Sequence, residues 1–435
     1  MGISGSIDLF HIELPFPVPD LLQNVTTPAE ISEAAAGLRQ AVAARELSPS
    51  DVMAVFDSWA ENLADPQLDD LPGIVFLRIW LRRSTLEPII ARELGSNGLQ
   101  GGWTDYGRAK CKAFPLGVVG HWPAGNVSIQ PLLSMTCALL GGNAALVRIP
   151  SGLVEVTSRL IEKLAQCDTG GVLTRRIFMA AFDHRQQDLQ EAMAQAVDGA
   201  MIWGAEEAIL RIRALPFPHW ARVLVFGPRI SVAAMDTGAW SDPSRQKPWC
   251  QRIARDVWQF DQQACSSPQV LFLEKGNGHS TAGFLRVLQR AFENENQAHP
   301  RRTIPPALTS AICQARASWL LADVGHQATF PKGPDWTLLV GSGSDIPKPV
   351  QGKTLTVLEV DNLLDAVSKF DGNVQTLGLG MDDPEREKQV ACLAGRKGVD
   401  RIVKLGRMHV FVPPWDGVDL IRPMVRMVRH VSSTE

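Results

Sequence analysis

The sequence predicts an α/β protein built on parallel β-sheets, and three observations support this class. The chain has 435 residues, of which 45% are hydrophobic and 20% charged, as is usual for a globular protein large enough for two cores. Short apolar runs alternate with helical segments between residues 117 and 226, which indicates β-α-β crossovers. A similar alternation follows from about residue 269. We therefore expect parallel sheets with helices on both faces.

The chain opens with helices whose start signals are clear. Residues 27–30 (Thr-Pro-Ala-Glu) and 48–51 (Ser-Pro-Ser-Asp) each combine a capping hydroxyl, a proline in the first helical position and an acid three residues after the cap, as helix N-termini require. They predict helices over 28–46 and 49–64. Beyond them we expect a helix over 74–94 and an extended arm or hairpin over 103–114.

The first sheet is predicted from the alternation that follows. We expect strands over 117–121, 144–149, 176–180, 199–203 and 222–226, separated by helices over 129–140, 153–166, 187–196 and 206–214. The polar, proline-bearing segment 236–248 is the predicted boundary, which gives a first domain over 1–240. A helix over 251–260 then leads into a second domain over 241–412, with strands near 269–273, 336–341, 374–380 and 401–404. Residues 413–435 are expected to return to the first domain or to a neighbouring subunit.

Several classes of function are disfavoured by composition. The formal net charge of −3 provides no basic surface for nucleic acid or an anionic membrane. Met1–Leu9 lacks the pattern of a signal peptide, and the most apolar run, 132–147, is interrupted by Gly-Gly-Asn, so no membrane span is expected. Seven cysteines without a C-x-x-C pair, and histidines without metal-ligand spacing, predict no metal site and a reducing cytoplasm.

One cysteine lies in an unusually polar segment. Residues 260–269 read Phe-Asp-Gln-Gln-Ala-Cys-Ser-Ser-Pro-Gln, directly ahead of an apolar strand. The small neighbours of Cys265 leave the open approach and the nearby N–H groups that a thiolate needs to attack a carbonyl carbon. A lone cysteine is also commonly a small buried hydrophobe. The segment alone leaves both interpretations open.

A second motif ends on an asparagine. Residues 115–127 read Pro-Leu-Gly-Val-Val-Gly-His-Trp-Pro-Ala-Gly-Asn-Val, which runs from a strand into a turn and stops just ahead of a helix. The amide of Asn126, paired with the N–H of Cys265, would hold the negative oxygen of a tetrahedral intermediate. The alternative is that Asn126 only caps the following helix.

Together the two motifs resemble the aldehyde dehydrogenase superfamily, which has a proline, two glycines and an asparagine at the offsets of Pro115, Gly117, Gly120 and Asn126, and a cysteine far downstream. The resemblance implies an aldehyde dehydrogenase-like α/β fold. Its first domain would be a Rossmann-like cofactor-binding domain, and its second a thiol-bearing catalytic domain.

Within this superfamily, residues 120–127 and 261–269 look like the acyl-CoA reductase (LuxC-type) family, which includes the fatty-acid reductase subunit of bacterial bioluminescence. The likeness extends from about residue 100 to the Pro-Pro-Trp-Asp-Gly stretch at 413–417. It implies NADPH-dependent reduction of a fatty acyl-CoA to the aldehyde through a thioacyl intermediate on Cys265. An acyl-activating synthetase partner and a homo-oligomer are implied as well.

Three positions would contact the cofactor by the same resemblance. Arg148 looks like the basic residue that contacts the adenosine ribose, and its guanidinium would suit a 2′-phosphate; without the resemblance, a surface arginine is an equal alternative. Gly204 matches the strand-to-helix turn near the pyrophosphate. Ala205 replaces the usual serine, so no hydroxyl contact is expected. The cofactor is therefore expected to be NADPH, with NADH as the alternative.

Two departures from the superfamily pattern matter. Leu224 stands where hydrolytic members carry a water-activating glutamate, so this chain lacks the usual means of hydrolysing a thioester. The acid that normally binds a ribose is missing around 346–354. Two rival hypotheses follow: a reductase of the same fold that uses an acyl phosphate or an acyl-carrier thioester, and a non-reducing subunit that relays an acyl group.

Overall fold

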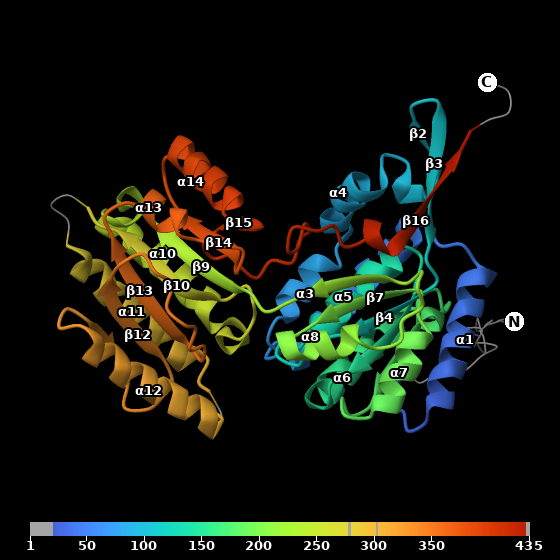
Figure 1. The fold of residues 1–435 in the computed structure, drawn as a ribbon, viewed down its shortest axis with the longest axis horizontal. Coiled ribbons are helices and arrows are strands. Elements are labelled where there is room, and N and C mark those ends of the chain that lie inside the picture. Colours follow the sequence, from blue (N-terminus) through green and yellow to red (C-terminus); the bar gives the residue numbers. More distant parts are fainter. Residues whose placement is uncertain (1–20, 277–279, 302, 432–435) are drawn as a thin grey trace, which may run out of the picture.

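The computed structural model describes residues 21–276, 280–301 and 303–431, and forms two α/β halves that lie side by side (Figure 1). Met1–Leu9 and the first part of the domain predicted over 1–240 lie outside the described residues. Each half is built on its own sheet, and a small third sheet pairs a strand near the C-terminus with a hairpin that precedes strand β4 (Val118–Trp122) of the first sheet. No helix among the described residues is both long and apolar enough to cross a membrane.

The first sheet has six parallel strands in the order β1-β6-β5-β4-β7-β8. Their bounds agree with the predicted strands within a residue, and β1 is the one the sequence did not predict: β1 (Leu22–Asn24), β4 (Val118–Trp122), β5 (Ala144–Ile149), β6 (Ile177–Ala181), β7 (Gly199–Trp203) and β8 (Arg222–Phe226).

Helices cover both faces of this sheet, as the apolar runs predict. Successive residues of a strand point to opposite faces, and Val118 and Val119 accordingly belong to two different cores. The helices of this half are α1 (Pro28–Ala44), α2 (Pro49–Asn62), α3 (Ile74–Trp80), α4 (Arg83–Leu94), α5 (Gln130–Leu140), α6 (Val154–Cys167), α7 (Gln187–Gln195) and α8 (Glu206–Arg213).

The predicted helix starts are confirmed, and one predicted helix is broken. Thr27 and Ser48 each form a complete capping box with the acid three residues on. The single helix expected over 74–94 is instead α3 and α4. Arg82 between them has an extended backbone (φ −71°, ψ 135°), which lets the Arg83 N–H donate to the Asp57 carboxylate at 2.9 Å. This tertiary bond replaces the helical one.

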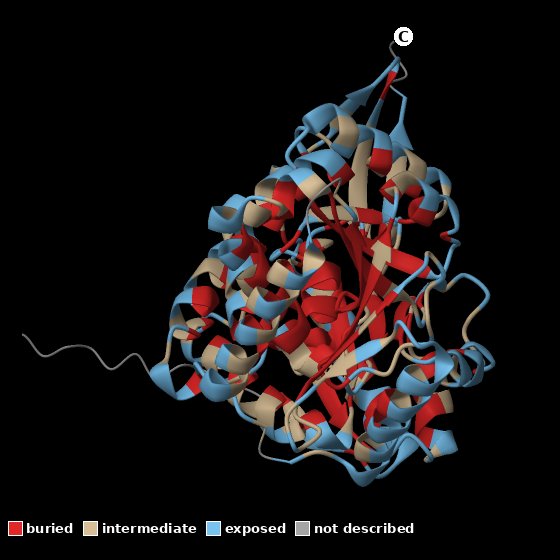
Figure 2. Ribbon diagram, turned by 90° about the vertical axis from the view of Figure 1, so that its left-hand side faces the viewer, coloured by how far each residue is buried: buried red, intermediate tan, exposed pale blue. Residues whose placement is uncertain are grey.

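The second sheet has seven strands in the order β11-β12-β13-β10-β9-β14-β15, all parallel except β11. Figure 2 shows its buried strands between helices whose outer faces are exposed. The strands are β9 (Ile230–Met235), β10 (Pro268–Glu274), β11 (Gln327–Thr329), β12 (Thr337–Ser342), β13 (Thr354–Val360), β14 (Val374–Gly380) and β15 (Arg401–Lys404). The helices are α9 (Thr237–Trp240), α10 (Pro243–Trp258), α11 (Thr281–Ala298), α12 (Pro306–Ala322), α13 (Leu363–Ser368) and α14 (Pro384–Arg396).

The chain changes sheet earlier than the predicted boundary segment. β8 ends at Phe226 in the first sheet, and β9 begins at Ile230 in the second. The polar segment 236–248 forms α9 and the start of α10, because its polar residues Asp236 and Asp242 cap these helices. Polarity there marks helix starts within the second half rather than a linker.

The C-terminal segment returns to the first half of the same chain. β16 (Val425–His430) pairs antiparallel with β3 (Ala109–Pro115), which in turn pairs with β2 (Thr104–Tyr106), so the hairpin predicted over 103–114 is confirmed. The buried Glu93 carboxylate accepts the N–H groups of Ile421 and Arg422 at 2.7 and 2.9 Å. Residues 413–424 thereby cross from the second half to the first (Figure 1).

Candidate active site

A cavity of about 870 Å³ lies between the two halves, and both contribute to its walls. The first half contributes the segments that follow β4, β5, β7 and β8, which all leave the carboxyl edge of the parallel sheet. This edge is where open α/β sheets bind ligands. The second half contributes residues 263–266, the loop at 349–351 and residues 409–416.

Cys265 follows a strained turn that buried side chains hold in place. Phe260, Asp261 and Gln262 have positive φ angles of 54°, 53° and 62°, a conformation that costs roughly 1 kcal/mol or more for each non-glycine residue. The fully buried Gln262 amide donates to the carbonyls of Pro268 and Thr354 at 2.8 Å, and accepts the Thr354 N–H at 2.7 Å. The loop that presents the thiol is therefore fixed before any ligand binds.

The Cys265 thiol is half-buried and faces the cavity. Its Sγ accepts a hydrogen bond from Gln375 Nε2 at 3.2 Å. Burial, and then the charge of Asp416, raise its pKa to about 11, against the effects of the Gln375 bond and of Arg401. The free thiol therefore stays protonated at neutral pH, and it needs help to ionise when substrate arrives.

His409 lines the cavity, but its imidazole is not available as a base. Its Nε2 lies 2.7 Å from the Asp256 carbonyl, and its Nδ1 lies 3.0 Å from Ser266 Oγ. Burial lowers its pKa to about 4. The ring is thus neutral, and its two nitrogens connect the cysteine loop at Ser266 to α10 at Asp256.

Asn126 reaches the cysteine loop from the other half of the molecule. Its side-chain amide donates to the carbonyl of Gln263, two residues ahead of Cys265, at 2.8 Å. The capping alternative is not supported, because α5 begins at Gln130 and its N-cap residue is Ile129, which makes no side-chain cap bond. The structure brings Asn126 and Cys265 to one cavity; the role of Asn126 as an oxyanion donor stays a prediction.

Arg148 lies at the carboxyl end of β5, where its guanidinium lines the cavity. Its Nε is buried and has no hydrogen-bond partner among the described residues, and burial lowers its pKa. The guanidinium lies over the Phe182 ring at 5.8 Å. A buried, unpartnered donor on a cationic group is a suitable partner for an anion.

Gly204 and Ala205 form the turn between β7 and α8 on the same wall. The Gly204 N–H donates to the Phe226 carbonyl at 3.2 Å, while Ala205 is the N-cap of α8 and makes no side-chain cap bond. Trp203 stacks on Phe226 with 3.7 Å between ring centroids. An uncapped helix N-terminus beside a flat aromatic pair suits a phosphate and a planar ring.

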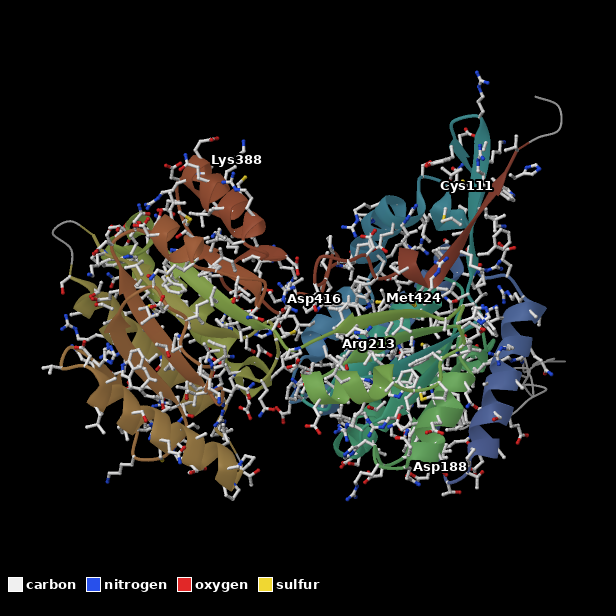
Figure 3. All side chains as sticks on the ribbon, viewed as in Figure 1. Cys111, Asp188, Arg213, Lys388, Asp416 and Met424 are labelled. Atoms are coloured by element: carbon white, nitrogen blue, oxygen red, sulfur yellow. The ribbon has the colours of Figure 1, made fainter. Side chains whose placement is uncertain are left out.

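The position of the missing glutamate offers no carboxylate to the cavity. Leu224 is half-buried in the middle of β8 and packs against the apolar core. Among the described residues that line the cavity, Asp416 has the only carboxyl group. It lies between the two halves (Figure 3), and its Oδ1 accepts from the same Gln375 amide that contacts the thiol. Burial raises the pKa of Asp416.

Sequence reasoning missed the residues that surround the thiol from behind. Gln375, Asp416, Arg401 and His409 come from β14, the C-terminal crossing segment, β15 and the loop after β15. Asp416 lies in the Pro-Pro-Trp-Asp-Gly stretch that carried the resemblance, and this is the one signal that pointed toward it. Gln375 lies beside Thr376 in a mostly apolar strand and gave no such signal. No three His, Cys, Asp or Glu side chains of the described chain gather as a metal site.

A family model described as acyl-CoA reductase (LuxC) matches residues 53–429, which is most of the chain. The chain belongs to the LuxC family. This match includes every element that lines the cavity, from the turn after β4 to Asp416. The predicted resemblance is thereby confirmed.

Curated proteins to which this chain is similar include two that are named long-chain acyl-protein thioester reductase. The one from Vibrio harveyi is 25% identical over 376 residues, which cover 84% of this chain and 74% of that relative. The one from Aliivibrio fischeri is 23% identical over 351 residues, which cover 80% and 71% respectively.

Solved structures confirm the aldehyde dehydrogenase-like fold of this LuxC family chain. An NADP-dependent enzyme from E. coli has a TM-score of 0.70 at 13% identity, over 93% of this chain and 90% of that one. The NADP-dependent glyceraldehyde-3-phosphate dehydrogenase of Bacillus halodurans, complexed with NADP, has a TM-score of 0.67 at 15% identity, over 93% and 92%. At such identities the likeness shows the fold alone.

Proposed function

We propose that this protein reduces a fatty acyl thioester to the aldehyde, with Cys265 as the nucleophile, acyl-CoA as the donor and NADPH as the reductant. The observation that supports it most is that Cys265, Asn126 and Arg148 line one cavity although they come from both halves of the chain. Membership of the acyl-CoA reductase family supports the same reaction.

The residues on the first-half wall fit a dinucleotide phosphate. The unpartnered Arg148 would pair with the 2′-phosphate, and the uncapped N-terminus of α8 at Ala205 would face the pyrophosphate. When bound there, the nicotinamide would supply a hydride to the acyl carbon. NADH would leave Arg148 without a phosphate partner, and for this reason we propose NADPH.

Cys265 carries the substrate through two bond exchanges. Its sulfur bonds to the acyl carbon, the bond from that carbon to the CoA sulfur breaks, and the thiol proton leaves with CoA. Asn126 and the Cys265 N–H would stabilise the negative oxygen of each tetrahedral stage. After reduction, the thiohemiacetal oxygen gives up its proton to Sγ as the carbon–sulfur bond breaks, and the aldehyde is released. The net reaction consumes one thioester, one NADPH and one proton, and yields aldehyde, CoA and NADP⁺.

An acyl-protein donor is the second candidate, because both relatives described above are named acyl-protein thioester reductases. Either donor delivers the same acyl group to the same sulfur, and the two differ only in the leaving thiol. Acyl-CoA and an acylated carrier protein should therefore be compared side by side, at equal acyl-chain length.

The test is single-turnover labelling with [¹⁴C]acyl-CoA, followed by addition of NADPH. Without NADPH, wild type should form a hydroxylamine-labile adduct, and NADPH should convert it to labelled aldehyde. Cys265→Ala should lose the adduct and at least about a thousandfold of the reductase activity, while Cys313→Ala, at an exposed cysteine, should keep both. An adduct that forms on Cys265 but is not reduced by NADPH or NADH would favour the acyl-relay hypothesis. Equal labelling of Cys265→Ala would remove this cysteine from the reaction.

A further inference from the structure

Gln375 occupies an irregular point of the second sheet. In the pairing of β14 with β9, Val374 lies opposite Ile230 and Thr376 lies opposite Ser231, so two steps along β14 match one step along β9. Gln375 is the extra residue of this bulge, and its side chain is fully buried. Bulges beside functional sites commonly redirect one side chain. A buried amide at such a point needs hydrogen-bond partners to offset its desolvation.

The partners of Gln375 fix the orientation of its amide. Nε2 donates one N–H to Cys265 Sγ at 3.2 Å and the other to Asp416 Oδ1. Oε1 accepts from Thr376 Oγ1 at 3.3 Å. Both N–H groups of the Gln375 amide therefore have acceptors, and the amide oxygen is held away from the sulfur.

A further cation supports this arrangement from behind. Arg401 donates to Thr376 Oγ1 at 2.9 Å, so the hydroxyl proton of Thr376 is left for Gln375 Oε1. Arg401 is itself buried, donates to the Val410 carbonyl at 3.0 Å and lies over the Trp415 ring at 4.1 Å. The series of hydrogen bonds from Arg401 through Thr376 and Gln375 ends at Cys265 Sγ. Each bond in the series determines which atom of the next residue acts as donor or acceptor.

We propose that Gln375 is a catalytic residue that stabilises the Cys265 thiolate through its amide N–H, and that Asp416 and Thr376 position this amide. The inference rests on the proposed role of Cys265 as nucleophile. A hydrogen bond to a charged acceptor is about twice as strong as one to a neutral acceptor, so the bond gains strength as the thiol ionises. An amide does not relay protons, which restricts Gln375 to stabilising charge.

Asp416 has two opposed effects on the thiol. Its carboxylate orients the Gln375 amide, but its negative charge disfavours a second negative charge on Sγ. Arg229 and Arg401 counter the charge of Asp416, while Asp400 adds to it. Asp416→Asn keeps an oxygen acceptor for Gln375 and removes the charge. Gln375→Leu removes the bond to sulfur and retains similar volume. The two substitutions should therefore change the reactivity of Cys265 in opposite directions.

The test is alkylation of Cys265 by iodoacetamide between pH 7 and pH 10, measured by mass spectrometry of the tryptic peptide 256–275, in which Cys265 is the only cysteine. Loss of one charge-assisted bond should raise the thiol pKa by about one unit. Because a more basic thiolate is also more nucleophilic, Gln375→Leu should be alkylated about threefold more slowly at each pH. Asp416→Asn should be alkylated about threefold faster.

The same digest controls for folding. Cys137 and Cys250 are fully buried, so their peptides should stay unmodified in a folded variant. Gln246→Leu is the matched control, because Gln246 is a buried glutamine of the same half whose amide bonds to the Trp240 carbonyl; it should alkylate like wild type. A loosened site would speed alkylation, so a slower Gln375→Leu cannot come from disorder.

Two outcomes would overturn the assignment. In the first, Cys265 of Gln375→Leu is alkylated at or above the wild-type rate while Cys137 and Cys250 stay protected. In the second, Gln246→Leu slows the alkylation of Cys265 to the same extent as Gln375→Leu does. The assay uses neither thioester nor NADPH. If the proposed reductase reaction fails, slower alkylation of Cys265 in Gln375→Leu would therefore still be evidence for thiolate stabilisation. The two proposals can fail separately.

Discussion

The two walls of the cavity differ in how their polar groups are satisfied. On the first-half wall, Arg148 Nε has no partner among the described residues, and the N-terminus of α8 has no side-chain cap. On the second-half wall, the groups around the thiol are bonded to one another, from Arg401 through Thr376 and Gln375 to Cys265. The first-half wall presents the free Arg148 Nε and an uncapped helix end to a ligand, whereas the bonded network of the second half holds Cys265, the proposed nucleophile.

This difference in hydrogen bonding indicates which role each wall can have. Unpaired donors cost free energy until an anion binds, so they favour binding of a charged ligand that comes and goes. A closed network resists reorganisation, so it can hold a nucleophile at a fixed position through several bond exchanges. The following substitutions test this division, from the largest expected effect to the smallest.

The second half contains, behind its cavity wall, a carboxyl group whose burial should make stability depend on pH. Asp256 is buried behind the cysteine loop and accepts the Gly406 N–H at 2.6 Å; burial raises its pKa from 3.8 to about 7. A raised pKa favours the folded state while the group is protonated. The contribution of the protonated Asp256 to the free energy of unfolding is therefore complete below pH 3.8 and is lost progressively up to about pH 7. It amounts to up to about 4 kcal/mol.

Asp256→Asn should remove that pH dependence. Urea unfolding of both proteins at pH 5 and pH 8 should show that the stability of wild type relative to the Asn variant falls between the two pH values. Comparing the variants cancels the contributions of other carboxyl groups. An unchanged difference would mean that the Asp256 carboxyl is ionised across this range.

Asn126 reaches the cysteine loop from the first half, through its bond to the Gln263 carbonyl. Asn126→Ala should lower kcat about a hundredfold, because the lost donor acts on the oxyanion of the transition state. KM for acyl-CoA should change much less. Steady-state kinetics across an acyl-CoA series would measure both constants. A raised KM with unchanged kcat would assign Asn126 to ground-state binding instead.

Arg148 tests the free donors of the first-half wall. Arg148→Met keeps the apolar stem and removes the guanidinium, so KM for NADPH should rise about tenfold, while KM for NADH should hardly change. Arg108→Met, at an exposed arginine in the β2–β3 turn, is the matched control and should alter neither. An equal rise for both cofactors would place Arg148 away from the 2′-phosphate.

The first half shows how much of a site local sequence can predict. Strands β4 to β8 agree with the predicted strands within a residue, because buried strands and amphipathic helices have distinct apolar patterns, whereas the three-residue β1 is not predicted. Asn126 is singled out by its motif, and Arg148 and Gly204 by the family resemblance; all three lie at or shortly after the carboxyl ends of parallel strands, which meet at one edge of the sheet. Capping boxes at Thr27 and Ser48 were equally local, and both were found.

Sequence alone determined the α/β class, singled out the polar segment around Cys265 and placed the strands whose ends line the cavity, because each depends on residues close together in the chain. Tertiary structure decided the rest. The break at Arg82 depends on Asp57, and Gln375 reaches Cys265 across 110 positions only because a bulge changes the register of β14 against β9. A glutamine in a mostly apolar strand gives no local sign of the distant residues it contacts, since register and burial are set by the strands it packs against.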